Sequence, residues 1–318
     1  MSVPTAPGGG PGPTPPGATG SAGSTNQSAF IPISALIDRS AARERKGFFT
    51  DTSLCIGCKA CEVACKQWNG LPSDGYEFTG FSYDNTQALS ATTWRHVAFV
   101  ERPGAGHAGA QSNWLMSSDV CKHCTHAGCL EACPTGAILR TEFDTVVVQQ
   151  DICNGCGYCV PSCPFGVVDL VEILAAEVTQ GPYSLHQQAP GNLAHKCTLC
   201  YDRLVDGIEP ACAKACPTDS IQFGDLDELR ARAERRVDEL HERGVPEAYL
   251  YGAREDDPGA TGGIGPLHAF FLLLDRPETY NLPARPQLPQ NNVLPGYVAT
   301  ALTAVVLGIG AALAFRRK

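Results

Sequence analysis

The sequence is poor in several residue types on which common protein classes depend. Only two Met and three Trp occur among its 318 residues, so no large aromatic core is expected. Lys and Arg number 24 against 33 Asp and Glu, and the net charge is −9. A nucleic-acid-binding protein needs clustered basic side chains for its phosphate contacts, so this class is not indicated. The sequence also lacks a Gly-rich nucleotide motif after a strand and a Ser/His/Asp arrangement, so no catalytic site of its own is predicted.

The N-terminal segment has little that could fold. Residues 1–28 are nearly all Pro, Gly, Ser, Thr and Ala, and such a stretch cannot bury enough surface to offset its ordering entropy. We predict that residues 1–44 form a disordered tail. The segment has no basic start followed by an apolar run, so a signal peptide is not expected.

Cysteine, by contrast, is abundant and regularly spaced. All 16 cysteines lie between Cys55 and Cys216 and fall into four groups of four. The groups are Cys55-x2-Cys58-x2-Cys61-x3-Cys65, Cys121-x2-Cys124-x4-Cys129-x3-Cys133, Cys153-x2-Cys156-x2-Cys159-x3-Cys163 and Cys197-x2-Cys200-x11-Cys212-x3-Cys216. Each group keeps a leading Cys-x2-Cys and a trailing Cys-x3-Cys, and no cysteine is left over. This pattern predicts four 4Fe–4S clusters.

The third group matches the bacterial ferredoxin run, including Pro164 after its last cysteine. In that run three thiolates surround one cluster and the fourth cysteine ligates the other cluster of a pair. Structural zinc sites instead use two separated cysteine pairs, and disulfide frameworks belong to short secreted chains, so both alternatives are disfavoured. Lys59, between Cys58 and Cys61, is a candidate for raising a cluster potential through its charge, and the alternative is a solvated side chain.

The pattern outside the cysteines favours an α+β fold. Short strand-like runs surround the cysteine groups, and residues 225–243 predict one amphipathic helix that Asp225 can cap. Residues 253–292 are rich in Gly, Pro and Asn, so we expect an extended arm rather than a domain. His268 in this arm is a candidate contact to a haem or quinone of a partner.

The C-terminal segment has the length and composition of a membrane span. Tyr297–Phe315 contains 19 residues without a charge and is followed by Arg316, Arg317 and Lys318. About 20 apolar residues cross a bilayer core as a helix. Ala304, Gly308 and Ala312 have the small-xxx-small spacing that favours a second membrane helix, so they are predicted to contact a membrane partner. The basic end is expected on the cytoplasmic side.

Taken together, these motifs resemble the iron–sulfur subunits that accompany molybdopterin oxidoreductases, and within them the beta subunit of membrane-bound respiratory formate dehydrogenase. The similarity spans roughly residues 45–315. The matching stretches include Cys55-Ile-Gly-Cys-Lys-Ala-Cys61, Cys153-Asn-Gly-Cys-Gly-Tyr-Cys159, Lys196-Cys-Thr-Leu-Cys200, Glu209-Pro-Ala-Cys212 and Asp275-Arg-Pro-Glu278. The segment 171–195 is longer than the family pattern.

The resemblance implies two ferredoxin-like modules that each hold two 4Fe–4S clusters. The first would comprise residues 45–116 and 190–224, and the second residues 117–189. Residues 225–292 would follow as helix and arm, and residues 293–318 as a transmembrane helix with a basic end. The implied ligand sets are Cys55, Cys58, Cys61 and Cys216 (set 1); Cys65, Cys197, Cys200 and Cys212 (set 2); Cys121, Cys124, Cys129 and Cys163 (set 3); and Cys133, Cys153, Cys156 and Cys159 (set 4).

The resemblance also implies a role and partners. A catalytic subunit with molybdenum or tungsten pterin would oxidise formate, and electrons would pass through the four clusters to a membrane cytochrome b and so to quinone. The chain itself would be a non-catalytic electron-transfer subunit, anchored in the cell membrane by a single pass, with its cluster-bearing body on the outer face. Two alternatives remain open. The same relay could serve a hydrogenase or a sulfur-compound or sulfoxide reductase, or the chain could be a membrane-anchored metal-binding or assembly protein.

Overall fold

The computed structural model describes residues 44–73, 80, 83–101, 114–172 and 192–316. The predicted disordered tail therefore lies outside the described residues, apart from Glu44, as does most of the long segment 171–195. The strands are β1 (Lys46–Asp51), β2 (Arg95–Glu101), β3 (Trp114–Val120), β4 (Ile138–Arg140), β5 (Val146–Val148), β6 (Asp169–Glu172), β7 (Asn192–His195), β8 (Ile221–Asp225), β9 (Tyr249–Tyr251) and β10 (Ala269–Leu273). The helices are α2 (Ala60–Asn69), α3 (Gly128–Glu131), α4 (Tyr201–Val205), α5 (Ala211–Lys214), α6 (Leu226–Glu242), α7 (Val293–Arg316) and the 3-10 turns η1 (Pro277–Tyr280) and η2 (Pro289–Asn292).

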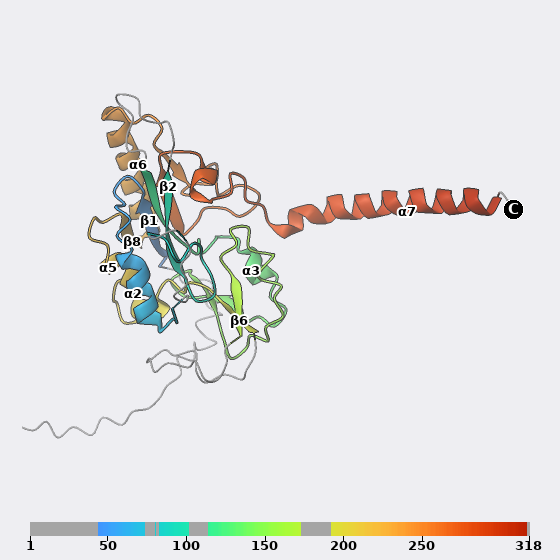
Figure 1. The fold of residues 1–318 in the computed structure, drawn as a ribbon, viewed down its shortest axis with the longest axis horizontal. Helices are drawn as coiled ribbons and strands as arrows, with labels where there is room; N and C mark the ends of the chain where they lie inside the picture. The colour runs from blue at the N-terminus through green and yellow to red at the C-terminus, as the bar shows by residue number, and fades with distance from the viewer. Residues whose placement is uncertain (1–43, 74–79, 81–82, 102–113, 173–191, 317–318) are drawn as a thin grey trace, which may run out of the picture. The chain divides into compact units, whose positions relative to one another are not determined.

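A four-stranded sheet in the order β8-β1-β10-β9 forms one part of the body (Figure 1). β1 runs antiparallel to β8 and parallel to β10, and β10 runs antiparallel to β9. All five residues of β10 are buried, and Phe270 stacks on Phe49 of β1 with ring centroids 5.4 Å apart. A continuous apolar run of this kind is typical of a strand covered on both faces.

This sheet corrects the expectation of an extended arm after the amphipathic helix. β10 comes from that segment, yet it is an inner strand of the sheet. Leu267, Tyr280 and Leu288 from the same segment are also buried. The Gly- and Pro-rich composition belongs to the turns on either side of β10. The five apolar residues of β10 are enough to form an inner strand.

The amphipathic helix is confirmed as α6. The Asp225 carboxylate accepts hydrogen bonds from the backbone N–H groups of Asp227 and Glu228, at 2.9 and 3.4 Å, and so caps the helix. Leu226, Leu229, Ala233 and Leu240 form its buried stripe, which belongs to the same apolar core as Phe270. Most charged side chains of α6 are exposed, whereas Arg230, Glu234 and Arg236 are half-buried.

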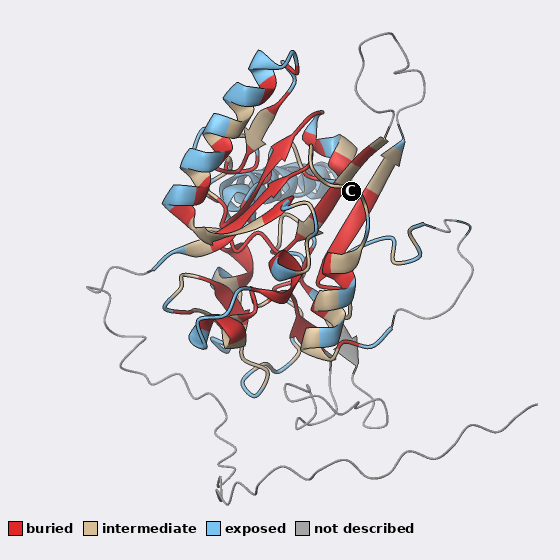
Figure 2. Cartoon of the chain, turned by 90° about the vertical axis from the view of Figure 1, so that its left-hand side faces the viewer, coloured by how far each residue is buried: buried red, intermediate tan, exposed pale blue. Residues whose placement is uncertain are grey.

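Three hairpins surround the cysteine groups. β2 pairs with β3, β4 with β5 and β6 with β7, all antiparallel. The first two pairs match the strand-like runs of the sequence. β7 lies in the range expected for the first module, but its partner β6 lies in the range expected for the second. Figure 2 shows that the strands of the body are mostly buried.

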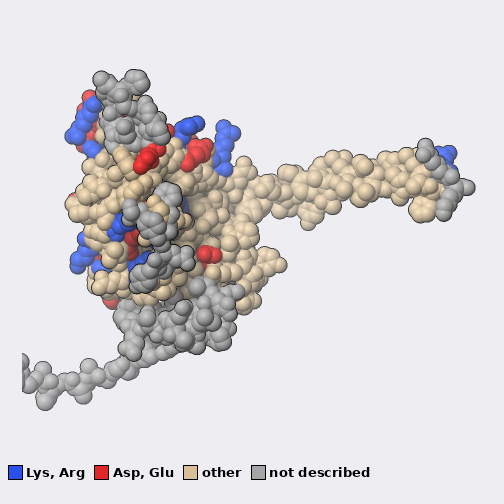
Figure 3. All heavy atoms as spheres, viewed as in Figure 1, with Lys and Arg blue, Asp and Glu red and all other residues tan. Residues whose placement is uncertain are grey.

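α7 is the C-terminal helix. It has 24 residues, all of them exposed, and at 1.5 Å per residue it is about 36 Å long. The hydroxyls of Thr300 and Thr303 donate to backbone carbonyls one turn earlier, so these polar groups are satisfied within the helix. α7 carries no Asp, Glu, Lys or Arg before Arg316, and the face of the helix seen in Figure 3 is uncharged over most of its length. α7 is therefore long and apolar enough to cross a membrane.

Candidate iron–sulfur sites

Three cavities of nearly equal volume are each lined by four cysteines. A cavity of about 290 Å³ is lined by Cys55, Cys58, Cys61 and Cys216. A second, of about 320 Å³, is lined by Cys121, Cys124, Cys129 and Cys163. A third, of about 300 Å³, is lined by Cys133, Cys153, Cys156 and Cys159. The structure thus brings together the residues of sets 1, 3 and 4, each drawn from two different cysteine groups.

The remaining four cysteines, those of set 2, also lie together. All four are buried. Burial raises the pKa of the Cys65 thiol well above its usual value, and the nearby thiolates of Cys197, Cys212 and Cys200 raise it further. Cys65, Cys197 and Cys212 belong to one apolar core with Phe48 of β1. Every cysteine of the chain therefore falls into one of four sets.

The residues of each set fit a cluster better than a single ion. Among the residues that the structure describes, no three His, Cys, Asp or Glu side chains converge closely enough to hold one metal ion. Four thiols around a common cavity are instead the donor set of a 4Fe–4S cube, whose irons are each ligated separately. The residues present therefore fit 4Fe–4S clusters and do not favour mononuclear zinc.

Local backbone geometry explains why the cysteine loops take this form. Gly57 in the first loop has φ 66°, and a Cβ at this position would lie 2.5 Å from the Phe99 ring. A larger residue would therefore clash with the ring as well as strain the backbone. Burial raises the pKa of the Cys55 thiol, and the backbone of Gly57 lowers it in part.

The thiols are costly to ionise without iron. Burial raises the pKa of Cys61 and of Cys159 to about 11, and that of Cys129 to about 12. The free thiols are therefore protonated at neutral pH, and the binding of iron to thiolates must release protons. The positive charge of iron would offset the burial of these sulfurs.

Neighbouring sets approach one another in a row. Burial is the main reason that the pKa of Cys61 is raised, and Cys212 of set 2 contributes. For Cys197 of set 2, burial again comes first in raising the pKa, followed by Cys121 of set 3. For Cys129 of set 3, the thiolate of Cys159 in set 4 is among the smaller causes of a raised pKa. Set 2 thus lies beside sets 1 and 3, and set 3 lies beside set 4.

The two ends of this row reach the surface. Cys58 of set 1 and Cys156 of set 4 are the two exposed cysteines. Exposed apolar side chains stand beside them in sequence, namely Ile56 and Tyr158, with 59% and 63% of their surface exposed. All the cysteines of set 2 are buried, and those of set 3 are buried or half-buried.

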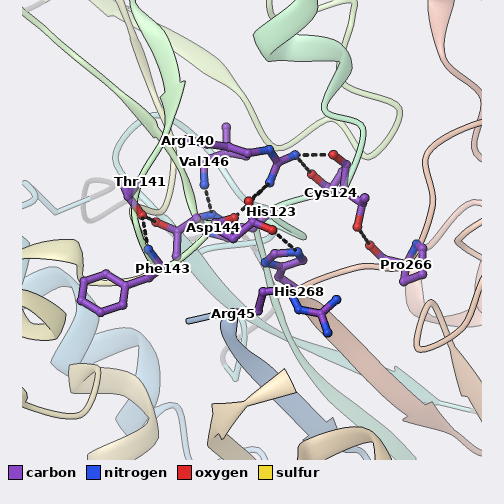
Figure 4. Close-up of polar contacts among 12 residues, drawn as sticks. Arg45, His123, Cys124, Arg140, Thr141, Phe143, Asp144, Val146, Pro266 and His268 are labelled. Atoms are coloured by element: carbon purple, nitrogen blue, oxygen red, sulfur yellow. Dashed lines mark hydrogen bonds and ion pairs between the residues drawn. The ribbon is translucent and has the colours of Figure 1, made fainter. Parts of the chain in front are cut away.

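A buried polar network supports the backbone next to set 3 (Figure 4). The Arg140 guanidinium donates to the backbone carbonyls of Cys124 and Thr125, and to the carbonyl of Asp144 at 3.0 Å. His123 Nδ1 accepts from the Val146 N–H at 3.0 Å. This network ties the second cysteine loop to the β4–β5 hairpin. The sequence carried no signal for it, because its bonds are made mostly to backbone atoms.

The structure answers the two hypotheses on single side chains. His268 is only 2% exposed, and its Nε2 lies 3.6 Å from the Asp144 carboxylate. Burial lowers the pKa of His268 to about 4, so it is a neutral core residue and does not face a partner. The Lys59 ammonium lies 3.0 Å from Glu62 and 2.8 Å from Asp84, so it is paired rather than solvated.

Comparison with known proteins identifies the family. Two family models described as 4Fe–4S dicluster domains match residues 54–137 and 112–226. The formate dehydrogenase iron–sulfur subunit of Haemophilus influenzae is 40% identical over 268 residues, which are 83% of this chain and 76% of the relative. The chain belongs to the family of formate dehydrogenase iron–sulfur subunits.

Other relatives agree with this membership. The nitrate-inducible formate dehydrogenase iron–sulfur subunit of Escherichia coli is 38% identical over 75% of this chain and 72% of the relative. A subunit of the anaerobic dimethyl sulfoxide reductase of Escherichia coli is 33% identical over 58% of this chain and 76% of the relative. The present iron–sulfur subunit is thus a non-catalytic electron-transfer subunit of an oxidoreductase complex, and 4Fe–4S clusters are its cofactors.

Proposed function

We propose that this subunit holds four 4Fe–4S clusters, one on each cysteine set, and carries electrons from a formate-oxidising subunit with molybdenum or tungsten pterin to a membrane cytochrome b and quinone. When bound, such a cluster takes up and releases one electron at a time. The observation that carries the proposal is that all sixteen cysteines sort into four sets, which form a row with one exposed cysteine at each end.

The chain's own residues would serve this relay in two ways. The two inner sets are buried in apolar surroundings, which excludes water from the middle of the row. The exposed apolar residues Ile56 and Tyr158 would let partner proteins pack closely at the ends. We assign sets 1 and 2 to one ferredoxin-like module and sets 3 and 4 to the other, because each pair exchanges its fourth ligands.

α7 would anchor the subunit. Its small residues Ala304, Gly308 and Ala312 would pack against a helix of the cytochrome subunit. The basic end would lie in the cytoplasm and the body on the outer face. Protease treatment of sealed, right-side-out vesicles tests this orientation: digestion of the body is expected, and its protection would reverse the assignment.

The test of the relay compares two electron acceptors. The complex is purified from membranes with detergent, and formate-dependent reduction of a dye and of a quinone analogue are measured. In a Cys156→Ser variant, dye reduction at the catalytic subunit is expected to persist, while quinone reduction falls at least tenfold. Equal quinone reduction by the variant and the wild type would contradict set 4 as part of the route. No formate-dependent activity in a wild-type complex with reducible clusters would favour a sulfoxide or other reductase as the partner.

A further inference from the structure

Arg95 of β2 is a buried cation with incomplete hydrogen bonding. The residue is 1% exposed. Its Nη1 donates to the Ser118 hydroxyl at 3.0 Å and to the Ser118 carbonyl at 3.4 Å. In the described part of the chain, Nε and Nη2 find no hydrogen-bond partner. An unpaired charge in the core is strongly unfavourable, so a compensating negative charge is expected nearby.

The groups around Arg95 come from two cluster sites. Burial lowers the pKa of Arg95, but the surrounding thiolates outweigh burial and raise it above its usual value, so the guanidinium stays charged. These thiolates are Cys212, Cys61, Cys197 and Cys65. One belongs to set 1 and three belong to set 2. Arg95 therefore lies where the first two sites of the row meet.

Two contacts hold the guanidinium at this place. Its Cζ lies 4.8 Å from the centroid of the Phe48 ring, a cation–π contact to β1. The Ser118 hydroxyl, which binds Nη1, also lies 3.3 Å from the Cys61 sulfur. A chain of two hydrogen bonds thus connects Arg95 to a ligand of set 1. The packing of Phe48 against Phe223, with centroids 5.9 Å apart, fixes the ring in turn.

Two other cations near the cysteines differ from Arg95. Lys59 is paired with Glu62 and Asp84, and Lys122 is paired with Asp119. The carboxylates offset most of the field of these two lysines at the clusters. Arg95 has thiolates in the place of a carboxylate, so its full charge acts on the cluster sites.

We propose that Arg95 raises the reduction potentials of the clusters at sets 1 and 2 together. This inference rests on the proposed ligand sets. A cluster with four thiolates is negatively charged and gains one further negative charge on reduction, so a fixed cation nearby stabilises the reduced form. Because the guanidinium is shared, its loss affects two clusters rather than one.

The experiment is a redox titration, followed by electron paramagnetic resonance, of the complex purified from membranes. An Arg95→Gln variant is expected to lower the midpoint potentials of two of the four clusters and leave the other two unchanged. In an Arg95→Lys variant the two potentials are expected to stay close to the wild-type values, because this variant keeps the charge. Arg254→Gln is the matched control, since this exposed arginine pairs with Glu234 on the surface. No cluster potential of this control variant is expected to change.

Each outcome decides the inference. Four unchanged potentials in an Arg95→Gln complex that retains its iron would overturn it, and so would an equal shift of all four. If that variant loses its clusters, Ser118→Ala takes its place, because it removes the hydroxyl that accepts from Nη1 and contacts the Cys61 sulfur. Ser118→Ala is expected to lower the potential of one cluster most, and an unchanged set of potentials would again overturn the inference. Fewer than four reducible clusters in the wild-type complex would instead count against the proposed function.

Discussion

Replacement of Phe270 by Ala tests whether β10 is part of the core that carries the cluster sites. Phe270 is fully buried and stacks on Phe49, which lies on the strand that leads into the first cysteine group. A buried Phe→Ala change costs about 3–5 kcal/mol through lost transfer energy and the cavity that remains. About 1 kcal/mol of this belongs to the aromatic pair. The change would remove a large share of a typical folding stability of about 5–15 kcal/mol.

The assay is the temperature at which the visible absorption of the clusters is lost in detergent, at one fixed heating rate. A fixed rate is needed because loss of clusters is irreversible. At roughly 2–4 °C per kcal/mol for a chain of this size, the expected decrease is about 6–20 °C. Phe315→Ala is the matched control, since this Phe on α7 is 77% exposed, and a change under about 2 °C is expected. A similarly small change for Phe270→Ala would refute the placement of β10 and restore the interpretation as an extended arm.

Two further predictions concern the first cysteine loop and the membrane helix. The buried Glu62 carboxylate accepts from the Val97 N–H and pairs with Lys59, so Glu62→Ala is expected to cost about 3–5 kcal/mol of folding stability. Iron analysis after mild heating is expected to show that the variant loses iron before the wild type does, and equal retention of iron by both proteins would contradict this. Gly308→Leu is expected to reduce co-purification of the membrane partner at least several-fold, whereas Val306→Leu on another face of α7 leaves it intact, and equal losses would argue against a small-residue contact.

Much of the site was accessible from the sequence because cluster chemistry is local. Cysteines three residues apart must place their thiols around one centre, so Cys153, Cys156 and Cys159 point to an iron–sulfur cluster without reference to the rest of the chain. The same holds for α6, where the cap at Asp225 and the apolar stripe lie within one segment.

The remaining features depend on contacts between distant segments. Parallel pairing of β1 with β10 joins Phe49 to Phe270, and no local pattern specifies which strand a short apolar run will join. For this reason a segment that reads as an arm becomes an inner strand. The ferredoxin run predicts the shared fourth cysteine for the third group. Its extension to the other groups, and which groups pair, was implied by the family resemblance, because spacing within a group does not show which other group supplies the fourth ligand.

The sequence by itself thus determined the kind of cofactor, the number of cysteine groups and the membrane-length helix, since each depends on residues close together in the chain. Only the tertiary structure decided the order of the sets and the position of Arg95. In the sequence, Arg95 stands alone between two cysteine groups. In the fold, it lies among Cys61, Cys65, Cys197 and Cys212. The physical reason is that electrostatic interaction depends on distance in space and on burial, and neither quantity follows from separation along the chain.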